Sequence, residues 1–200
     1  VASTKAFTAQ LTVLYLLALQ LGKIRNSRSL SELQDVGRDL LKLPSQIAEV
    51  LENSKSMVEL AKSFKDAKTV LFLGRHVGFP IAMEGALKLK ELAYIHAEGF
   101  AGGELKHGPI ALIEDGTAVI AILPPADEHA LDEKMLSNIQ EVKARKGKII
   151  SIVTEGDKVV KDLSDYVIEI PKCDDSLVPL ISVIPLQLLS LIQGLLFSLH

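Results

Sequence analysis

The sequence has one cysteine, no tryptophan and few aromatic residues, which make up 4% of its 200 residues. Cys173 cannot form a disulfide within one chain, and such cysteine usage is typical of a reducing compartment. Asp174 and Asp175 follow it directly, and their carboxylates oppose the thiolate form that a nucleophilic cysteine needs. We therefore expect a cytoplasmic protein without a catalytic thiol.

Long basic runs are also lacking. The 22 Lys and Arg residues against 25 Asp and Glu residues give a formal net charge of -3, which offers no electrostatic footprint for nucleic acid. The GxGxxG fingerprint and the P-loop are absent, so neither NAD nor ATP is supported. HExxH is absent too, and His96 and His107 lie far apart across a loop. We expect no nucleic-acid partner, no cofactor and no metal.

What the sequence does have is apolar residues, 48% of the total, enough for the core of a domain of ordinary size. Residues 177–199 carry no charge and could cross a bilayer by length, but Pro179, Pro185 and several Ser and Gln residues dilute the run. We interpret this run and residues 4–21 as buried helices, and expect no membrane partner. No signal peptide is visible, and the chain, which opens on Val1, looks cut at both ends.

The first third of the chain predicts helices. Gly22 is a typical helix stop, residues 29–32 and 56–59 read as capping boxes, and Pro44 suits the start of a new helix. The predicted helices cover 4–21, 29–42, 44–53 and 56–64.

The remainder alternates strands and helices, which predicts a doubly wound α/β unit with a parallel, flavodoxin-like sheet flanked by helices. The predicted strands are 69–73, 118–123, 148–153 and 166–170, with a further short strand at 96–99 and helices at 80–93 and 128–146. Ligands of such folds bind at the carboxyl ends of the strands. The turn at 74–78 lies at such an end and is either an anion-binding turn or a plain tight turn.

Ionisable residues are concentrated in one segment. Glu84, Lys88 and Glu91 are spaced i, i+4 and i+7, which places them on one face of the 80–93 helix. A solvated salt-bridge ladder is the common outcome of this spacing. The alternative is a site in which a carboxylate, an ammonium and an imidazole move protons between adjacent sugar carbons, because His96 and His107 follow in a glycine-rich connection.

These motifs resemble the glutamine:fructose-6-phosphate aminotransferase family, also called glucosamine-6-phosphate synthases. The resemblance is carried by residues 1–8, 84–91, 94–98, 103–109 and 183–189. It implies an isomerase half built from two sugar-isomerase (SIS) repeats, preceded by a glutaminase domain. By this resemblance, residues 1–28 end the first repeat, 29–58 are a helical connector, and 59–200 are the second repeat without its C-terminal tail.

The resemblance also implies the residue roles. Glu91 is the base that carries a proton between C1 and C2 of the fructose imine, and Lys88 is its partner at a substrate hydroxyl. His107 opens the sugar ring in the pocket of the neighbouring subunit of a homodimer, while Val1 and Ser3 line the sugar site. The product is glucosamine 6-phosphate, the first intermediate towards UDP-N-acetylglucosamine.

Three parts of the family's machinery are missing from these residues: the phosphate loop of the first repeat, the glutaminase cysteine and the imine-forming lysine of the tail. We therefore expect the 200 residues alone to be inactive. A non-catalytic SIS module that senses sugar phosphates is the alternative to the enzyme, and it would need no base at Glu91.

Overall fold

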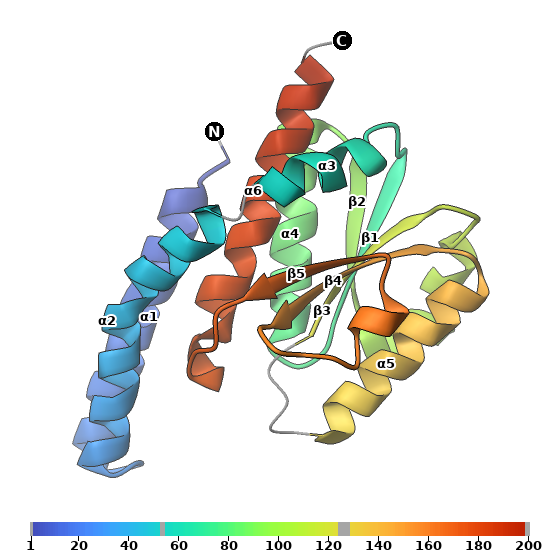
Figure 1. The fold of residues 1–200 in the computed structure, drawn as a ribbon. Helices are drawn as coiled ribbons and strands as arrows, with labels where there is room; N and C mark the ends of the chain where they lie inside the picture. Colours follow the sequence, from blue (N-terminus) through green and yellow to red (C-terminus); the bar gives the residue numbers. More distant parts are fainter. Residues whose placement is uncertain (1, 53–54, 124–128, 199–200) are drawn as a thin grey trace.

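A computed structural model describes residues 2–52, 55–123 and 129–198. It contains a five-stranded sheet in the order β2-β1-β3-β4-β5, with every neighbouring pair parallel (Figure 1). The strands are β1 (Thr69–Gly74), β2 (His96–Ala101), β3 (Ala118–Ile122), β4 (Lys148–Thr154) and β5 (Tyr166–Ile170). The predicted parallel α/β fold is thus confirmed, and its strand order reverses between β1 and β3.

Helices cover both faces of the sheet. One face carries α4 (Gly78–Ala93) and α6 (Val178–Ser198), and the other carries α5 (His129–Ala144) (Figure 1). The first three helices, α1 (Thr4–Arg25), α2 (Leu30–Glu52) and α3 (Lys55–Ser63), each contact α6 (Figure 1). Short 3-10 helices complete the chain: η1 (Gly102–His107), η2 (Pro109–Leu112), η3 (Lys161–Leu163) and η4 (Asp175–Leu177).

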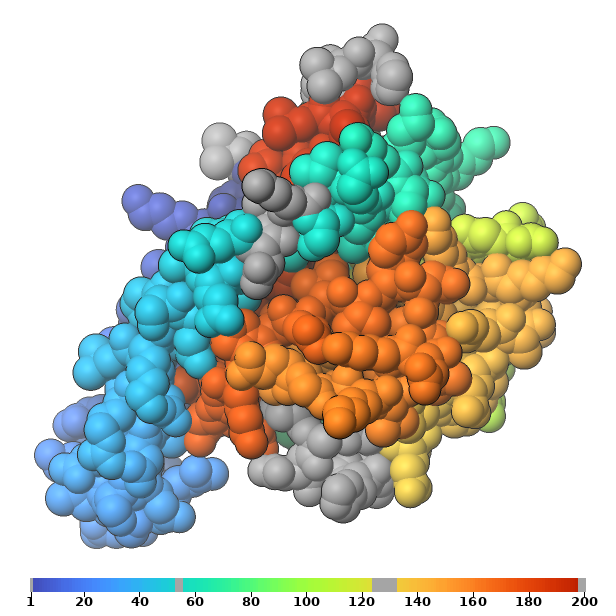
Figure 2. Space-filling model, viewed as in Figure 1, coloured from blue at the N-terminus to red at the C-terminus, as the bar shows by residue number. Residues whose placement is uncertain are grey.

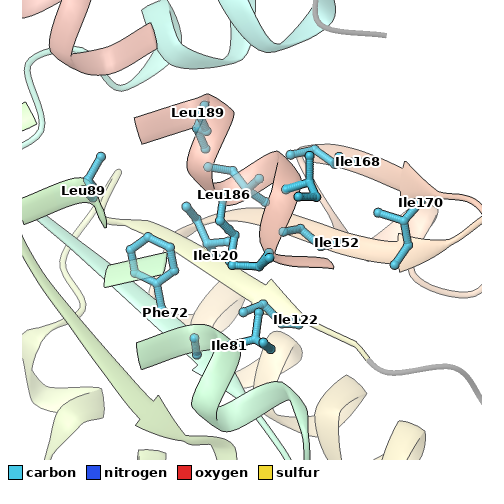
Figure 3. Close-up of a cluster of buried hydrophobic side chains, with 14 of the residues drawn as sticks. Phe72, Ile81, Leu89, Ile120, Ile122, Ile152, Ile168, Ile170, Leu186 and Leu189 are labelled. Atoms are coloured by element: carbon cyan, nitrogen blue, oxygen red, sulfur yellow. The ribbon is translucent and has the colours of Figure 1, made fainter. Parts of the chain in front are cut away.

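The strands bury side chains on both faces, because successive residues point in opposite directions. Phe72 and Ile120 join the core beneath α4 and α6, whereas Leu71 and Val119 join the core beneath α5. Figure 3 shows the first of these cores, where isoleucines of the strands face Leu186 and Leu189 of α6. Fully buried β-branched strands of this kind are what a doubly wound sheet requires.

Several helix boundaries differ from the prediction. The first helix passes Gly22 and ends at Arg25, because Asn26 adopts the left-handed conformation (φ 50°) and its N–H caps the carbonyls of Gly22 and Lys23. The second helix runs through Pro44 without a break, so two predicted helices are one. The capping box at Ser29 is confirmed, since the Ser29 N–H donates to the Glu32 carboxylate at 2.8 Å. α3, by contrast, begins at Lys55, which places Ser56 inside the helix.

The two long apolar helices have different surroundings. α6 is buried against the sheet, as predicted, and this accounts for its composition. The prediction that α1 is buried is wrong: no residue of α1 is buried, and Val13 and Ile24 are 62% and 64% exposed. α1 packs along the core through one stripe of side chains, and its remaining apolar residues face away from that contact. Both helices are long and apolar enough to cross a membrane by length and composition.

The flank of β5 is covered by the chain's first half. Gln46 of α2 donates a hydrogen bond to the carbonyl of Lys172, just beyond β5, at 2.8 Å. Figure 2 shows α2 and α3 bordering the orange segment that contains β5. Helices of the first half of the chain thus border the β5 edge of the sheet, which edge strands commonly need.

Close packing of α4 against α6 yields the first testable prediction. A Cβ at Gly194 would lie 2.3 Å from the backbone oxygen of Leu92, so Gly194→Ala must push the two helices apart and lower the free energy of unfolding by about 1–3 kcal/mol. Gly37→Ala is the matched control, because a Cβ there meets nothing within 4 Å. It should raise stability by about 0.5–1 kcal/mol, and urea unfolding of both variants measures the contrast. Equal changes in the free energy of unfolding for Gly194→Ala and Gly37→Ala would contradict the close contact of α4 with α6.

Candidate functional site

Lys88 is the centre of the site. It is only 3% exposed, and its Nζ donates to Glu91 Oε2 at 2.5 Å and to the Ala2 carbonyl at 2.6 Å. Glu84 Oε1 lies 3.6 Å from the same nitrogen. The three ionisable residues predicted to share one helical face therefore form one cluster, and the solvated-ladder interpretation is wrong for Lys88.

Two elements far apart in sequence build this cluster. α4 supplies Glu84, Lys88 and Glu91 from successive turns, which helix geometry brings together. The start of α1 supplies the Ala2 carbonyl, 86 positions away from Lys88. The ammonium thus joins the beginning of the chain to the helix that carries the candidate base.

Burial within the cluster is uneven, and this separates the two carboxylates. The Glu84 side chain is 12% exposed, and this burial raises its pKa above the ordinary value, although the Lys88 charge opposes the shift. The Glu91 side chain is 41% exposed. Glu91 is therefore the carboxylate that a ligand can reach, whereas Glu84 supports Lys88 from inside.

Ser3 lies next to Ala2 at the start of α1. Its backbone is left-handed (φ 50°), which is unusual for serine, and its hydroxyl makes no capping hydrogen bond to the helix. Ser3 thus occupies the N-cap position of α1 without capping it through its side chain, and the residue is exposed. Val1 lies outside the described residues.

His107 is not brought to this cluster within the chain. It is exposed at the end of η1, whose Leu105 is buried in the core on the α5 face of the sheet. Lys88 belongs to α4, on the opposite face. One chain therefore presents the carboxylate–ammonium pair on one side and the imidazole on the other.

The turn at 74–78 is tight. A Cβ at Gly74 would lie 2.1 Å from the carbonyl oxygen of Gly78, so no other residue fits there without rearrangement. The Gly78 N–H donates to the Arg75 carbonyl at 2.8 Å. The Arg75 side chain donates through Nε and Nη2 to Asn138 Oδ1 at 3.2 and 3.1 Å. These bonds favour the plain tight-turn interpretation.

Comparison with known proteins places this arrangement in a family. The SIS domain model matches residues 63–196. The chain belongs to the SIS-domain family. The matched segment covers the whole sheet and all three helices that flank it, including the helix that carries Lys88.

Individual SIS relatives agree with the resemblance found in the sequence. The chain is 51% identical to the glutamine–fructose-6-phosphate aminotransferase (isomerizing) of Corynebacterium efficiens over 189 residues, which are 94% of this chain and 30% of that protein. The same enzyme of Tropheryma whipplei is 53% identical over 96% of this chain and 31% of its own length. The chain thus spans less than a third of the length of these relatives.

Solved structures of related proteins have the same fold as this chain. The C-terminal domain of glucosamine-fructose-6-phosphate aminotransferase from Francisella tularensis superimposes with a TM-score of 0.90 at 39% identity, over 99% of this chain and 55% of that one. A putative tagatose-6-phosphate ketose/aldose isomerase from Clostridium novyi matches with a TM-score of 0.75 at 27% identity, over 84% of this chain and 44% of that one. The fold is therefore shared with proteins named for sugar phosphates.

Two contacts of this region could not be predicted from the sequence. The Ala2 carbonyl is a backbone group, so residue type does not reveal it. The Arg75–Asn138 pair joins residues 63 positions apart, so no local pattern predicts this contact. Helical spacing, by contrast, correctly grouped Glu84, Lys88 and Glu91.

The lone thiol has the surroundings that its neighbours predict. Cys173 is half-buried, and burial together with the charges of Asp174, Asp175 and Asp39 raises its pKa to about 11. A thiol with so high a pKa is protonated at neutral pH, which agrees with the expectation that it is not a nucleophile.

Glu84 yields a prediction about pH. Because burial raises its pKa in the folded chain, its contribution to stability is complete below the ordinary pKa and is lost as pH rises through the raised value. Glu84→Gln removes this loss, so the unfolding free energy of the variant should rise relative to wild type as the pH increases above the ordinary pKa of a glutamate. Urea unfolding of both proteins measures the difference. Glu59→Gln, at a 72% exposed carboxylate, should show no such trend. If the unfolding free energy of Glu84→Gln relative to wild type stays constant or falls as the pH rises, the pKa of Glu84 is not raised in the folded chain.

Proposed function

We propose that this chain is part of the isomerase half of a glutamine:fructose-6-phosphate aminotransferase. The complete protein would convert fructose 6-phosphate and glutamine-derived ammonia into glucosamine 6-phosphate. The observation that carries the proposal is the buried Lys88 held against the accessible carboxylate of Glu91. Identity of about half to named aminotransferases supports it independently.

Glu91 is the proposed base. Its carboxylate removes a proton from C1 of the fructose imine and returns one to C2, so the sugar is isomerised with no net gain or loss of atoms. Lys88 donates a hydrogen bond to Glu91 and so holds that carboxylate in place. Its ammonium group carries further protons that can be donated to a substrate hydroxyl beside Glu91. Ser3 and Val1 are proposed to contact the sugar beside them.

His107 is proposed to open the sugar ring in a second copy of the chain. The opposite placement of His107 and Lys88 supports this proposal, since one copy alone separates the imidazole from the carboxylate. A homodimer would combine the Glu91 of one copy with the His107 of the other.

The domain boundaries and cellular setting follow as part of the same proposal. Residues 1–28 would end a first SIS repeat, 29–58 would form a connector, and 59–200 would form most of the second repeat. The extent of the matched SIS segment, 63–196, is compatible with this division. A glutaminase domain of the same full-length chain would supply the ammonia, and we place the protein in the cytoplasm.

The test uses a full-length chimera in which these 200 residues replace the matching segment of the Corynebacterium efficiens relative. Glu91→Gln should lower kcat for glucosamine 6-phosphate synthesis by about 10²–10⁴-fold, because the amide cannot accept the proton. Binding of fructose 6-phosphate, measured by calorimetry, should change little. The matched control is Glu59→Gln, an exposed glutamate on α3 that should leave both quantities unchanged.

The outcome separates the enzyme from the sugar-phosphate sensor. A sensor needs no base, so a chimera that binds sugar phosphate but never turns over would support the sensor. Full activity of the Glu91→Gln chimera would remove Glu91 from the chemistry. Loss of binding together with activity would assign Glu91 to substrate binding instead of proton transfer.

A further inference from the structure

The segment η1 is supported by one face of α5. Met135, Asn138 and Glu141 recur every three residues along α5, and all three meet η1 or its neighbours. Met135 and Asn138 are 1% and 3% exposed, so this face is an interior surface. A six-residue 3-10 helix has little stability of its own, and its position depends on such support.

The first contact is at Gly102, where η1 begins. A Cβ at Gly102 would lie 2.8 Å from Asn138 Oδ1, 3.0 Å from Met135 Sδ and 3.1 Å from Arg75 Cγ. The backbone therefore rests directly on the Arg75–Asn138 pair, with no room for a side chain. Arg75 also borders the next residue, because a Cβ at Gly103 would lie 3.6 Å from its Nη1.

The Arg75–Asn138 pair is itself rigid. Nε and Nη2 of Arg75 both donate to the one Oδ1 of Asn138, at 3.2 and 3.1 Å. A planar guanidinium that donates twice to one oxygen has a restricted orientation. The pair thus joins the end of β1, the middle of α5 and the start of η1.

The rest of η1 is fastened at two further points. Leu105 is fully buried in the core on this face, and Lys106 Nζ lies 2.7 Å from Glu141 Oε1. His107 follows directly and is exposed. These contacts, at Gly102, Leu105 and Lys106, lie directly upstream of His107, which is itself exposed.

We propose that Arg75 and Asn138 are positioning residues for His107. They hold the backbone of η1 so that the imidazole is presented at a defined place to a second copy of the chain. This inference rests on the proposed role of His107 in opening the sugar ring. Misplacement of a catalytic group by about 1 Å can cost about 10²-fold in rate, so a rigid support for η1 is expected to matter.

The experiment compares a substrate that must be opened with one that cannot close. Fructose 6-phosphate forms a ring through its 5-hydroxyl, whereas 5-deoxyfructose 6-phosphate lacks that group and stays open. In the chimera, Asn138→Leu removes the acceptor for Arg75. It should lower kcat/KM for fructose 6-phosphate by about tenfold or more and leave the value for the open analogue within about twofold.

Three companion variants make the result specific. Asn138→Asp keeps an oxygen for Arg75 and should retain most of the activity on both substrates. Gly102→Ala, which displaces η1 while Asn138 stays intact, should reproduce the selective loss. Ser151→Ala is the matched control. The buried Ser151 hydroxyl forms a hydrogen bond with Ser164, away from η1. Its loss weakens the fold without moving η1, so kcat/KM should change by the same factor for both substrates.

His107→Ala separates failure of this inference from failure of the proposed function. If His107→Ala shows the selective loss and both Asn138→Leu and Gly102→Ala do not, Arg75 and Asn138 do not position His107. If His107→Ala lowers kcat/KM equally for fructose 6-phosphate and for the open analogue, the ring-opening role is wrong. The proposed positioning role of Arg75 and Asn138 is then wrong as well. If Asn138→Leu and Gly102→Ala lower kcat/KM equally for both substrates, Arg75 and Asn138 stabilise the fold and do not position His107.

Discussion

The structure around the site depends on a buried ammonium. Lys88 is almost completely shielded from water, and an uncompensated charge in that position would cost several kcal/mol. Two carboxylates and one carbonyl compensate it, and the carbonyl belongs to Ala2 at the start of another helix. The same charge therefore places the beginning of α1 beside α4 and orients Glu91. Fold and proposed chemistry share this one interaction.

The packing of α4 keeps Lys88 where it is. α4 packs against both the sheet and α6, and its Gly85 lets these elements approach closely: a Cβ there would lie 2.7 Å from Leu186 and 2.9 Å from Phe72. Across the sheet, α5 supports η1 in a comparable way through Asn138 and Gly102. The two proposed halves of the chemistry are thus held on opposite faces of one sheet, which agrees with the proposal that a second copy unites them.

Much of this could be predicted from the sequence, for physical reasons that also explain the misses. Strand positions followed from short β-branched runs, and the Lys88 cluster followed from helical spacing. The end of α1 was missed because Asn26, not Gly22, adopts the left-handed cap. The exposure of α1 was missed because an apolar helix looks the same whether or not its partner is present. The Arg75–Asn138 contact depends on tertiary packing, which local patterns do not contain.

A crystal structure of the full-length chimera with glucosamine 6-phosphate bound tests the central claim most directly. The account predicts that C1 and C2 of the sugar lie within about 3–3.5 Å of the Glu91 carboxylate, with Lys88 at a sugar hydroxyl and the His107 of the partner copy near the ring oxygen. A sugar bound at the carboxyl edge of the sheet, beside the turn at 74–78 and away from Lys88, would contradict it.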